Sequence, residues 1–191
     1  MNPKTKTQLL LALGTVILGA CSGAVSTTDF ANSQFDFGYV ERVAVLPFEN
    51  LSGDRQAGVR TTRLLITELL ATGAVDVVEP GDVQAALAKI PGGGNPPTNQ
   101  EVIKLGQTLG VQAIIRGSVT ESQVLRSGNV TYPVVTLDIH MIETETGQSV
   151  WAGTHTEKGG NWGAQFLGTG AEPISATTRK CVRALLEVMV G

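Results

Sequence analysis

The sequence lacks an excess of positive charge and a long apolar run, and each absence excludes a class of protein. Lys and Arg number 14 against 17 Asp and Glu, so the chain has no basic excess with which to bind nucleic acid. The apolar run Leu9–Ala20 has 12 residues, whereas a helix that spans a bilayer needs roughly 20. We therefore expect no nucleic-acid partner and no membrane-spanning helix in this run.

Catalytic motifs are also missing from the sequence. It contains no nucleophile elbow of the form Gly-x-Ser-x-Gly. No pair of Asp or Glu has a spacing that would fix two carboxylates around a substrate. The turn ENLSGD, residues 49–54, precedes a predicted helix but lacks the Gly-Lys-Ser/Thr of a phosphate-binding loop. These absences predict a protein that is not an enzyme and that holds no cofactor.

Residues 1–20 have the layout of a bacterial secretory signal. Lys4 and Lys6 precede the apolar run, and Cys21 follows Leu-Gly-Ala, which resembles the lipobox of bacterial lipoproteins. The resemblance implies that Cys21 starts the mature chain and carries three acyl chains such as palmitate, enough for stable attachment to a membrane. Ser22, rather than Asp, after the cysteine implies an address at the periplasmic face of the outer membrane. The alternative is an ordinary cleaved signal with an incidental cysteine.

Residues 21–39 are expected to be the acylated cysteine and a tether. Residues 22–36 are small and polar with scattered Phe, and fully extended they reach roughly 50 Å, so the domain stays near its membrane. The only other cysteine, Cys181, shares a helical spacing with apolar residues such as Leu185. Because a free cysteine behaves as a small hydrophobic residue, Cys181 is expected in the core.

Hydrophobic periodicity predicts one α/β domain over residues 40–191. The expected strands are 42–48, 75–78, 111–119, 135–141 and 148–156, and the expected helices are 54–72, 82–88, 98–109 and 173–190. Thr98 and Glu101 form a capping box that starts the third helix. Two strands joined by a helix imply a parallel pair, and the last two strands read as a hairpin. The order β-α-β-α-α-β-β-β-α predicts a mixed β-sheet with packed helices.

The two histidines, His140 and His155, fall on the two strands of the predicted hairpin. A two-residue turn at Thr146 and Gly147 would place Asp138, His140 and His155 on one face, where they could hold a metal. A bulge at Gly147 would shift the register by one residue and put the histidines on opposite faces. The sequence leaves both registers open, and we expect no metal site. The basic residues Arg179, Lys180 and Arg183 are expected on a solvated helix face.

Several segments occur together in a familiar order: the lipobox, VAVLPFENLSGD, LLATGAVDVVEPGDVQAAL, LGVQAIIRGSVTE and DIHMIETETGQSVWAGTHTEKG. This order resembles the curli-secretion lipoprotein (CsgG-like) superfamily, which includes LpoB-type penicillin-binding-protein activator lipoproteins. The resemblance covers about residues 40–190. It implies an envelope protein without catalysis that works by assembly or partner binding on a compact α/β domain.

Two insertions of the secretion pore have short counterparts in this chain. In the pore, membrane hairpins follow the strands that correspond to residues 111–119 and 148–156. The counterparts here are about residues 121–129 and 159–171. A membrane hairpin needs about 20 residues plus a turn, so a pore built by this chain alone is not expected.

The sequence therefore predicts an outer-membrane-anchored periplasmic lipoprotein that acts without catalysis as an assembly or accessory factor in secretion or envelope organisation. The alternative is a monomeric periplasmic binding or regulatory module for an envelope enzyme such as a penicillin-binding protein. Expected partners are the membrane, through acyl chains on Cys21, envelope proteins, and further copies of the chain in a homo-oligomer. Trp162, Phe166 and the hairpin are the apolar groups expected to contact such partners.

Overall fold

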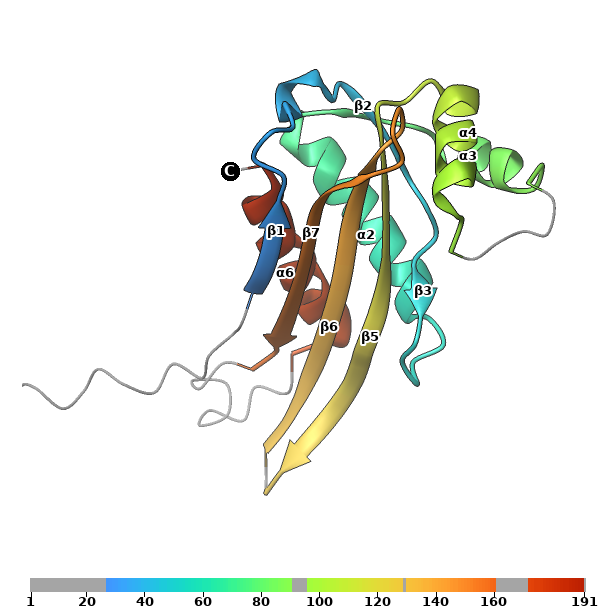
Figure 1. Cartoon of the computed structure of the whole chain (residues 1–191). Helices are drawn as coiled ribbons and strands as arrows, with labels where there is room; N and C mark the ends of the chain where they lie inside the picture. Colours follow the sequence, from blue (N-terminus) through green and yellow to red (C-terminus); the bar gives the residue numbers. More distant parts are fainter. Residues whose placement is uncertain (1–26, 91–95, 129, 161–171, 191) are drawn as a thin grey trace, which may run out of the picture.

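A mixed sheet of seven strands forms the centre of the computed structural model, which describes residues 27–90, 96–128, 130–160 and 172–190. The strands lie in the order β1-β7-β6-β5-β2-β4, and β3 pairs with β5 (Figure 1). Their bounds are β1 Thr27–Ala31, β2 Arg42–Val45, β3 Glu49–Asn50, β4 Asp76–Val77, β5 Ala113–Ser127, β6 Val130–Glu143 and β7 Ser149–Lys158. The β2, β4 and β5 pairings are parallel, and the β5-β6-β7-β1 pairings are antiparallel.

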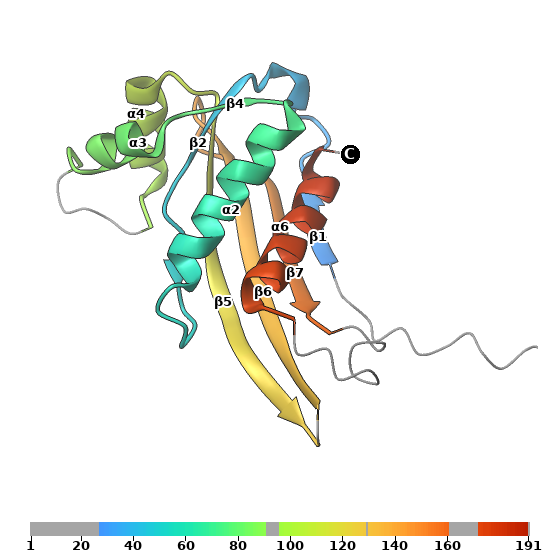
Figure 2. The ribbon, with the colours of Figure 1, turned by 180° about the vertical axis from the view of Figure 1, so that it is seen from behind.

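Helices pack on both faces of this sheet. Their bounds are α2 Ala57–Thr72, α3 Pro80–Leu87, α4 Asn99–Leu109 and α6 Ile174–Val190, with a 3-10 helix η1 at Phe37–Tyr39. Helices α2 and α6 lie side by side on one face, over a core that includes Trp151 and Leu185 (Figure 2). Helices α3 and α4 cover β2 and part of β5 on the other face, around Ala44 and Ile114. Among the described residues, no helix covers β6 and β7 on this second face (Figure 1).

The helix ends follow local sequence signals. Helix α2 ends at Gly73, whose φ of 64° is the left-handed conformation that glycine adopts without steric cost. Thr98 caps α4 by accepting from the Glu101 amide, while the Glu101 carboxylate accepts from the Thr98 amide, so the predicted capping box is confirmed. Asp82 was the expected start of α3 but lies in its first turn, because Pro80 takes the first helical position and Glu79 precedes it.

The predicted fold class is confirmed: one α/β domain with a mixed sheet and packed helices. The predicted parallel pair is β2 with β4, and the predicted hairpin is β6 with β7. Apolar side chains alternate toward the α2 and α6 face along β6, where Leu137, Ile139 and Met141 are buried. This burial fixes the register of the strand against its neighbours.

The expectation of a free tether over residues 21–39 is wrong for its second half. Residues 27–31 form β1, which pairs antiparallel with β7, and Phe37–Tyr39 form η1. All five β1 residues are exposed, because β1 lies at the edge of the sheet, so it carries no burial pattern that the sequence could reveal. Phe35 and Phe37 pack against the core, which anchors the connection to β2.

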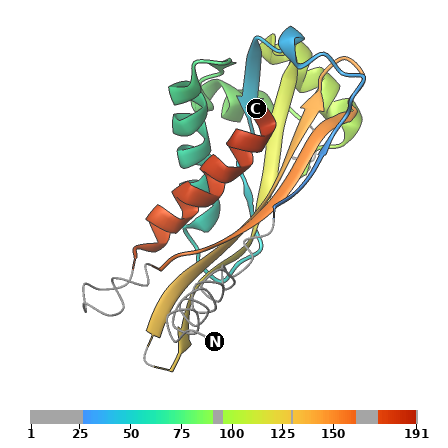
Figure 3. The same ribbon diagram turned by 90° about the vertical axis from the view of Figure 1, so that its left-hand side faces the viewer.

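The hairpin of β5 and β6 is much longer than the predicted strands. It pairs residue by residue from Ala113 with Glu143 to Ser127 with Val130, with one irregularity between Val119 and Glu121. Its far part extends beyond the end of β7, which stops opposite Val134 (Figure 3). The prediction missed this part because residues 120–128 are mostly exposed and lack the period-2 alternation of a half-buried strand.

The molecule has two distinct ends. The turn between β5 and β6 lies at the hairpin end, together with the start of β1 and the start of α6 (Figure 1). The last turns of α2 and α6 lie with η1 at the opposite end (Figure 2). No helix within the described residues is long and apolar enough to cross a membrane.

Candidate functional site

Polar side chains gather on the sheet face that α2 and α6 leave uncovered. Strands β5 and β6 place Arg116 opposite His140 and Ser118 opposite Asp138. Since successive side chains of a strand point to opposite faces, these four residues share one face and alternate with buried residues such as Ile115. The register of one hairpin therefore creates the polar cluster.

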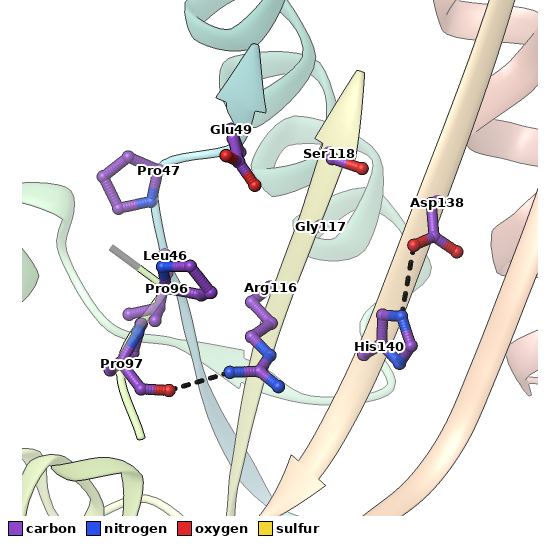
Figure 4. A pocket seen from close by; sticks show the side chains of 10 residues that line it. All are labelled: Leu46, Pro47, Glu49, Pro96, Pro97, Arg116, Gly117, Ser118, Asp138 and His140. Carbon is purple, nitrogen blue, oxygen red and sulfur yellow. Dashed lines mark hydrogen bonds and ion pairs between the residues drawn. The ribbon is translucent and has the colours of Figure 1, made fainter. Parts of the chain in front are cut away.

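This cluster forms the floor of a pocket of about 190 Å³ (Figure 4). The connection between β2 and β3 makes one wall with Pro47, and the segment before α4 makes another with Pro97. Gly117 lies in the floor between Arg116 and Ser118, and an added Cβ there would point toward Phe48 in the core. The complete lining is Leu46, Pro47, Glu49, Pro96, Pro97, Arg116, Gly117, Ser118, Asp138 and His140.

The polar groups of the pocket are held by contacts within the protein. Arg116 Nη1 donates to the Pro97 carbonyl oxygen at 2.9 Å, which fixes the segment before α4. His140 Nε2 lies 3.2 Å from Asp138 Oδ2, and Thr154 Oγ1 donates to Asp138 Oδ1 at 2.9 Å. No described serine or cysteine side chain hydrogen-bonds to a histidine ring. The arrangement suits recognition of a polar ligand group and does not show an activated nucleophile.

The two histidines lie on opposite faces of the sheet. Asp138 pairs with Thr154 and His140 with Ala152, while His155 pairs with Leu137, which is the bulge register that the sequence left open. The irregularity in this ladder lies between Met141 and Ile142 and not at Gly147, whose φ of 71° belongs to the connecting turn. Asp138, His140 and His155 therefore cannot meet at one metal ion, and the described residues contain no group of three or more His, Cys, Asp or Glu able to hold one.

His155 belongs to a buried cluster that joins β1 to the core. Its Nδ1 lies 2.6 Å from the Thr27 hydroxyl of β1, and its Nε2 lies 3.2 Å from Glu157 Oε2. Cys181 donates from Sγ to the His155 carbonyl oxygen at 3.3 Å and is fully buried, so its predicted place in the core is confirmed. Burial, with the nearby Glu157 charge, raises the pKa of the Cys181 thiol to about 12. No pattern in the sequence indicated the contact between His155 and Thr27.

The turn ENLSGD is held by a charge cluster at the start of α2. Asp54 accepts hydrogen bonds from Arg60, the Ser122 hydroxyl and the Gln56 amide. Burial alone would raise the pKa of Asp54, but these hydrogen bonds, led by that from Arg60, outweigh it and lower the pKa. The carboxylate supplies the negative charge that a helix start favours, but the N-cap residue of α2, Gln56, makes no side-chain cap hydrogen bond, so the predicted capped start is not found.

The basic residues of α6 are paired with acidic ones. Arg179 and Arg183 both contact Glu68 of α2, and Lys180 contacts Glu172 at 2.8 Å. All three basic side chains are more than half exposed, as expected for a solvated helix face. Such exposed pairs contribute little to stability, and they leave no strong positive patch on this helix.

An apolar groove lies at the opposite end of the molecule, between η1 and the last turns of α2 and α6. This helix-end groove has a volume of about 300 Å³ and is lined by Phe37, Gly38, Val40, Leu69, Ala74, Val75, Ile115, Met141, Met189 and Val190. Exposed apolar side chains occur on the elements that form it: Tyr39 is 45% exposed, Leu70 56% and Val190 51%. The apolar groups Trp162 and Phe166, expected at a partner contact, lie outside the described residues.

Comparison with known proteins identifies the fold. No family model and no curated protein matches the sequence. The PelC dodecamer from Paraburkholderia phytofirmans has a TM-score of 0.57 at 16% identity, over 84% of this chain and 96% of that one. Lipoprotein GNA1162 from Neisseria meningitidis has a TM-score of 0.53 at 15% identity, over 68% of this chain and 92% of that one. The LpoB C-terminal domain from Salmonella enterica has a TM-score of 0.50 at 16% identity, over 65% and 86%.

These identities are low, so the likeness concerns the fold. The chain has the α/β fold found in LpoB, GNA1162 and PelC, which supports the LpoB-type part of the resemblance seen in the sequence. Membership of the CsgG-like superfamily stays a prediction.

Proposed function

We propose that this chain is an outer-membrane-anchored periplasmic lipoprotein that acts without catalysis as an accessory factor in secretion or envelope organisation. The observation that carries the proposal is the helix-end groove, which is lined mostly by apolar residues, one of which, Val190, is 51% exposed. Apolar side chains gathered around a groove in this way are typical of surfaces that another protein covers.

Membrane attachment in this proposal depends on Cys21. Its position after Leu-Gly-Ala, behind two lysines and an apolar run, is the sequence support for acylation. The likeness to lipoprotein GNA1162 is support from the fold. Mass spectrometry of the protein purified from bacterial membranes tests the acylation directly, with Cys21→Ala as the control that abolishes it. An unmodified Cys21 in the membrane-purified protein would refute the anchor.

For the occupant of the helix-end groove, we favour a second copy of the chain. The fold is shared with PelC, which is a dodecamer, over 84% of this chain. Assembly of copies through the groove would remove the exposed part of Val190 from water, a gain of about 25 cal/mol per Å² of apolar surface. The shared fold and the groove together support a homo-oligomer.

The test is the solution mass of residues 22–191, measured by light scattering over a range of concentrations. We expect a discrete multimer that dissociates in Val190→Asp, because Val190 lines the groove and is 51% exposed. Val188→Asp is the matched control, because Val188 is 40% exposed on the same helix and does not line the groove. A multimer that survives Val190→Asp would place the interface elsewhere, and a monomer at all concentrations would refute the homo-oligomer.

The alternative is a monomeric module that binds an envelope enzyme such as a penicillin-binding protein. It is supported by the fold shared with the LpoB C-terminal domain. Crosslinking in cells distinguishes the two functions, because a photoreactive residue at Val190 would yield a homodimer in the first and a heterologous adduct in the second. If neither adduct forms from position 190 while one appears from position 188, the groove is not the contact surface.

A further inference from the structure

The position of β1 determines how far the domain can lie from its lipid anchor. Since β1 begins at Thr27, only residues 22–26 separate it from Cys21. Six residue steps, fully extended, reach about 20 Å. The acyl chains on Cys21 must therefore enter the bilayer within about 20 Å of Thr27.

The hairpin of β5 and β6 extends the same distance from Thr27. Thr27 pairs with His155, which pairs with Leu137 of β6, so these three residues lie at one level of the sheet. From Leu137 to Val130 at the turn, β6 continues for seven residues, or about 23 Å at 3.3 Å per residue. The turn of the hairpin and the furthest reach of Cys21 thus lie at nearly the same distance from Thr27.

Both extensions point to the same end of the molecule. Strand β1 runs antiparallel to β7 and starts at the hairpin end, so the chain enters β1 from that side (Figures 1 and 3). An anchor at the opposite end would require residues 22–26 to turn back along β1 and, fully extended, to reach the level of Glu143, the last residue of β6, six residue steps from Leu137. The direction in which the chain enters β1 therefore points to the hairpin end as the side that faces the membrane.

The composition of the hairpin turn suits contact with lipid head groups. Arg126 is the only charged residue between Glu121 and Asp138, although the chain as a whole has a net charge of −3. The Arg126 side chain is exposed. At the adjacent position of the ladder, Leu125 of β5 pairs with Tyr132 of β6. Arginine is attracted to anionic lipid, and tyrosine is enriched at the level of the head groups.

We propose that the hairpin tip, residues 125–127 and 130–132, rests on the head groups of the anchoring membrane and fixes the orientation of the domain. This inference rests on the proposed acylation of Cys21. Beyond the last residue paired with β3, β5 continues for eight residues, Thr120–Ser127, fewer than the roughly 9 of a membrane-crossing strand. The tip therefore contacts the membrane surface rather than crossing it, and the helix-end groove faces away from the membrane.

The test uses the full acylated protein in vesicles of phosphatidylethanolamine and phosphatidylglycerol that contain a lipid with a nitroxide on its head group. A fluorophore is attached to a single introduced cysteine, either Ser127→Cys at the tip or Gln84→Cys on α3. Cys181 is buried and Cys21 is acylated, so neither competes for the label. We expect the fluorophore at 127 to lose most of its emission and the one at 84 to keep it.

Charge reversal at the tip makes the test specific. Arg126→Glu is expected to restore most of the emission at 127 while the protein still sediments with the vesicles. Lys89→Glu, at an exposed position just after α3, is the matched control without effect. Emission at 127 that is unquenched, or quenching that is equal at 127 and 84, would overturn the orientation. Protein that stays in the supernatant and shows an unmodified Cys21 by mass spectrometry would overturn the acylation, and the inference with it.

Discussion

Gly117 is the position where an added methyl group tests the packing of the sheet most severely. It pairs with Ile139 in the centre of the β5 and β6 hairpin. A Cβ atom at Gly117 would lie 2.3 Å from the Asp138 carbonyl oxygen and 2.7 Å from Phe48 Cε1, whereas real Cβ contacts stay above 3.0 Å. The first obstacle is backbone of a paired strand and the second is a buried aromatic ring, so neither can give way without disturbing the ladder or the core.

We expect Gly117→Ala to destabilise the domain by about 1–3 kcal/mol, the usual cost of overpacking, against a gain of about 0.4–1 kcal/mol from the stiffer unfolded chain. For a domain of this size each kcal/mol lowers the melting temperature by about 2–4 °C. Gly81→Ala is the matched control: Gly81 is the second residue of α3, a Cβ there meets nothing within 4 Å, and the exchange should stabilise by about 0.5–1 kcal/mol.

The assay is thermal unfolding of residues 22–191 followed by circular dichroism. The two alanine variants should move the melting temperature in opposite directions from the parent. A Gly117→Ala protein that melts at or above the parent temperature would refute the close approach of the Asp138 carbonyl and Phe48 to this position.

Three further predictions concern single side chains. Asp54→Asn should lower the free energy of unfolding at neutral pH. Folding lowers the pKa of Asp54, so the stabilisation by its carboxylate is fully present above about pH 3.8 and is lost as the pH falls through the pKa in the folded protein. Urea unfolding midpoints of the parent and the variant should therefore converge in acid. Cys181 should resist a thiol reagent at pH 8 until the protein unfolds, since burial holds its pKa near 12; rapid labelling of native protein would contradict this. Thr98→Ala should remove the α4 cap at a cost of about 1 kcal/mol, seen as a lower urea midpoint, with Thr108→Ala as the control inside the same helix.

The sequence predicted those parts of the fold that bury one face of an element. Leu137, Ile139 and Met141 alternate along β6, and the apolar strand β2 stands between charged and turn residues, so both patterns report burial directly. Strand β1 was missed because it lies on the sheet edge with every residue exposed. The far part of the hairpin was missed for the same reason, since strand pairing alone, without burial, leaves no periodic signal.

The candidate site was less predictable because it depends on register and on contacts distant in sequence. The sequence pattern placed His140 and Asp138 on one face, but it left two registers open for the hairpin. In the register that the structure adopts, His155 lies on the opposite face. One wall of the pocket is held by the hydrogen bond from Arg116 to the Pro97 carbonyl oxygen. A backbone oxygen is present at every residue, so the sequence does not indicate that Arg116 binds this one. The helix-end groove likewise arises where η1 meets α2 and α6, three segments far apart in the chain.

The docking of β1 changes what the anchor can do. A free tether over residues 22–36 would reach roughly 50 Å and would not restrict the orientation of the domain relative to its anchor. With β1 paired to β7 and held by the contact between Thr27 and His155, only residues 22–26 lie between the sheet and Cys21, the proposed site of the anchor. The sheet runs from β1 through β5 to the parallel strands near the helix-end groove, so the proposed anchor and the groove are connected by one continuous sheet. In the proposed orientation the groove lies on the side away from the membrane, and a partner would approach it from that side.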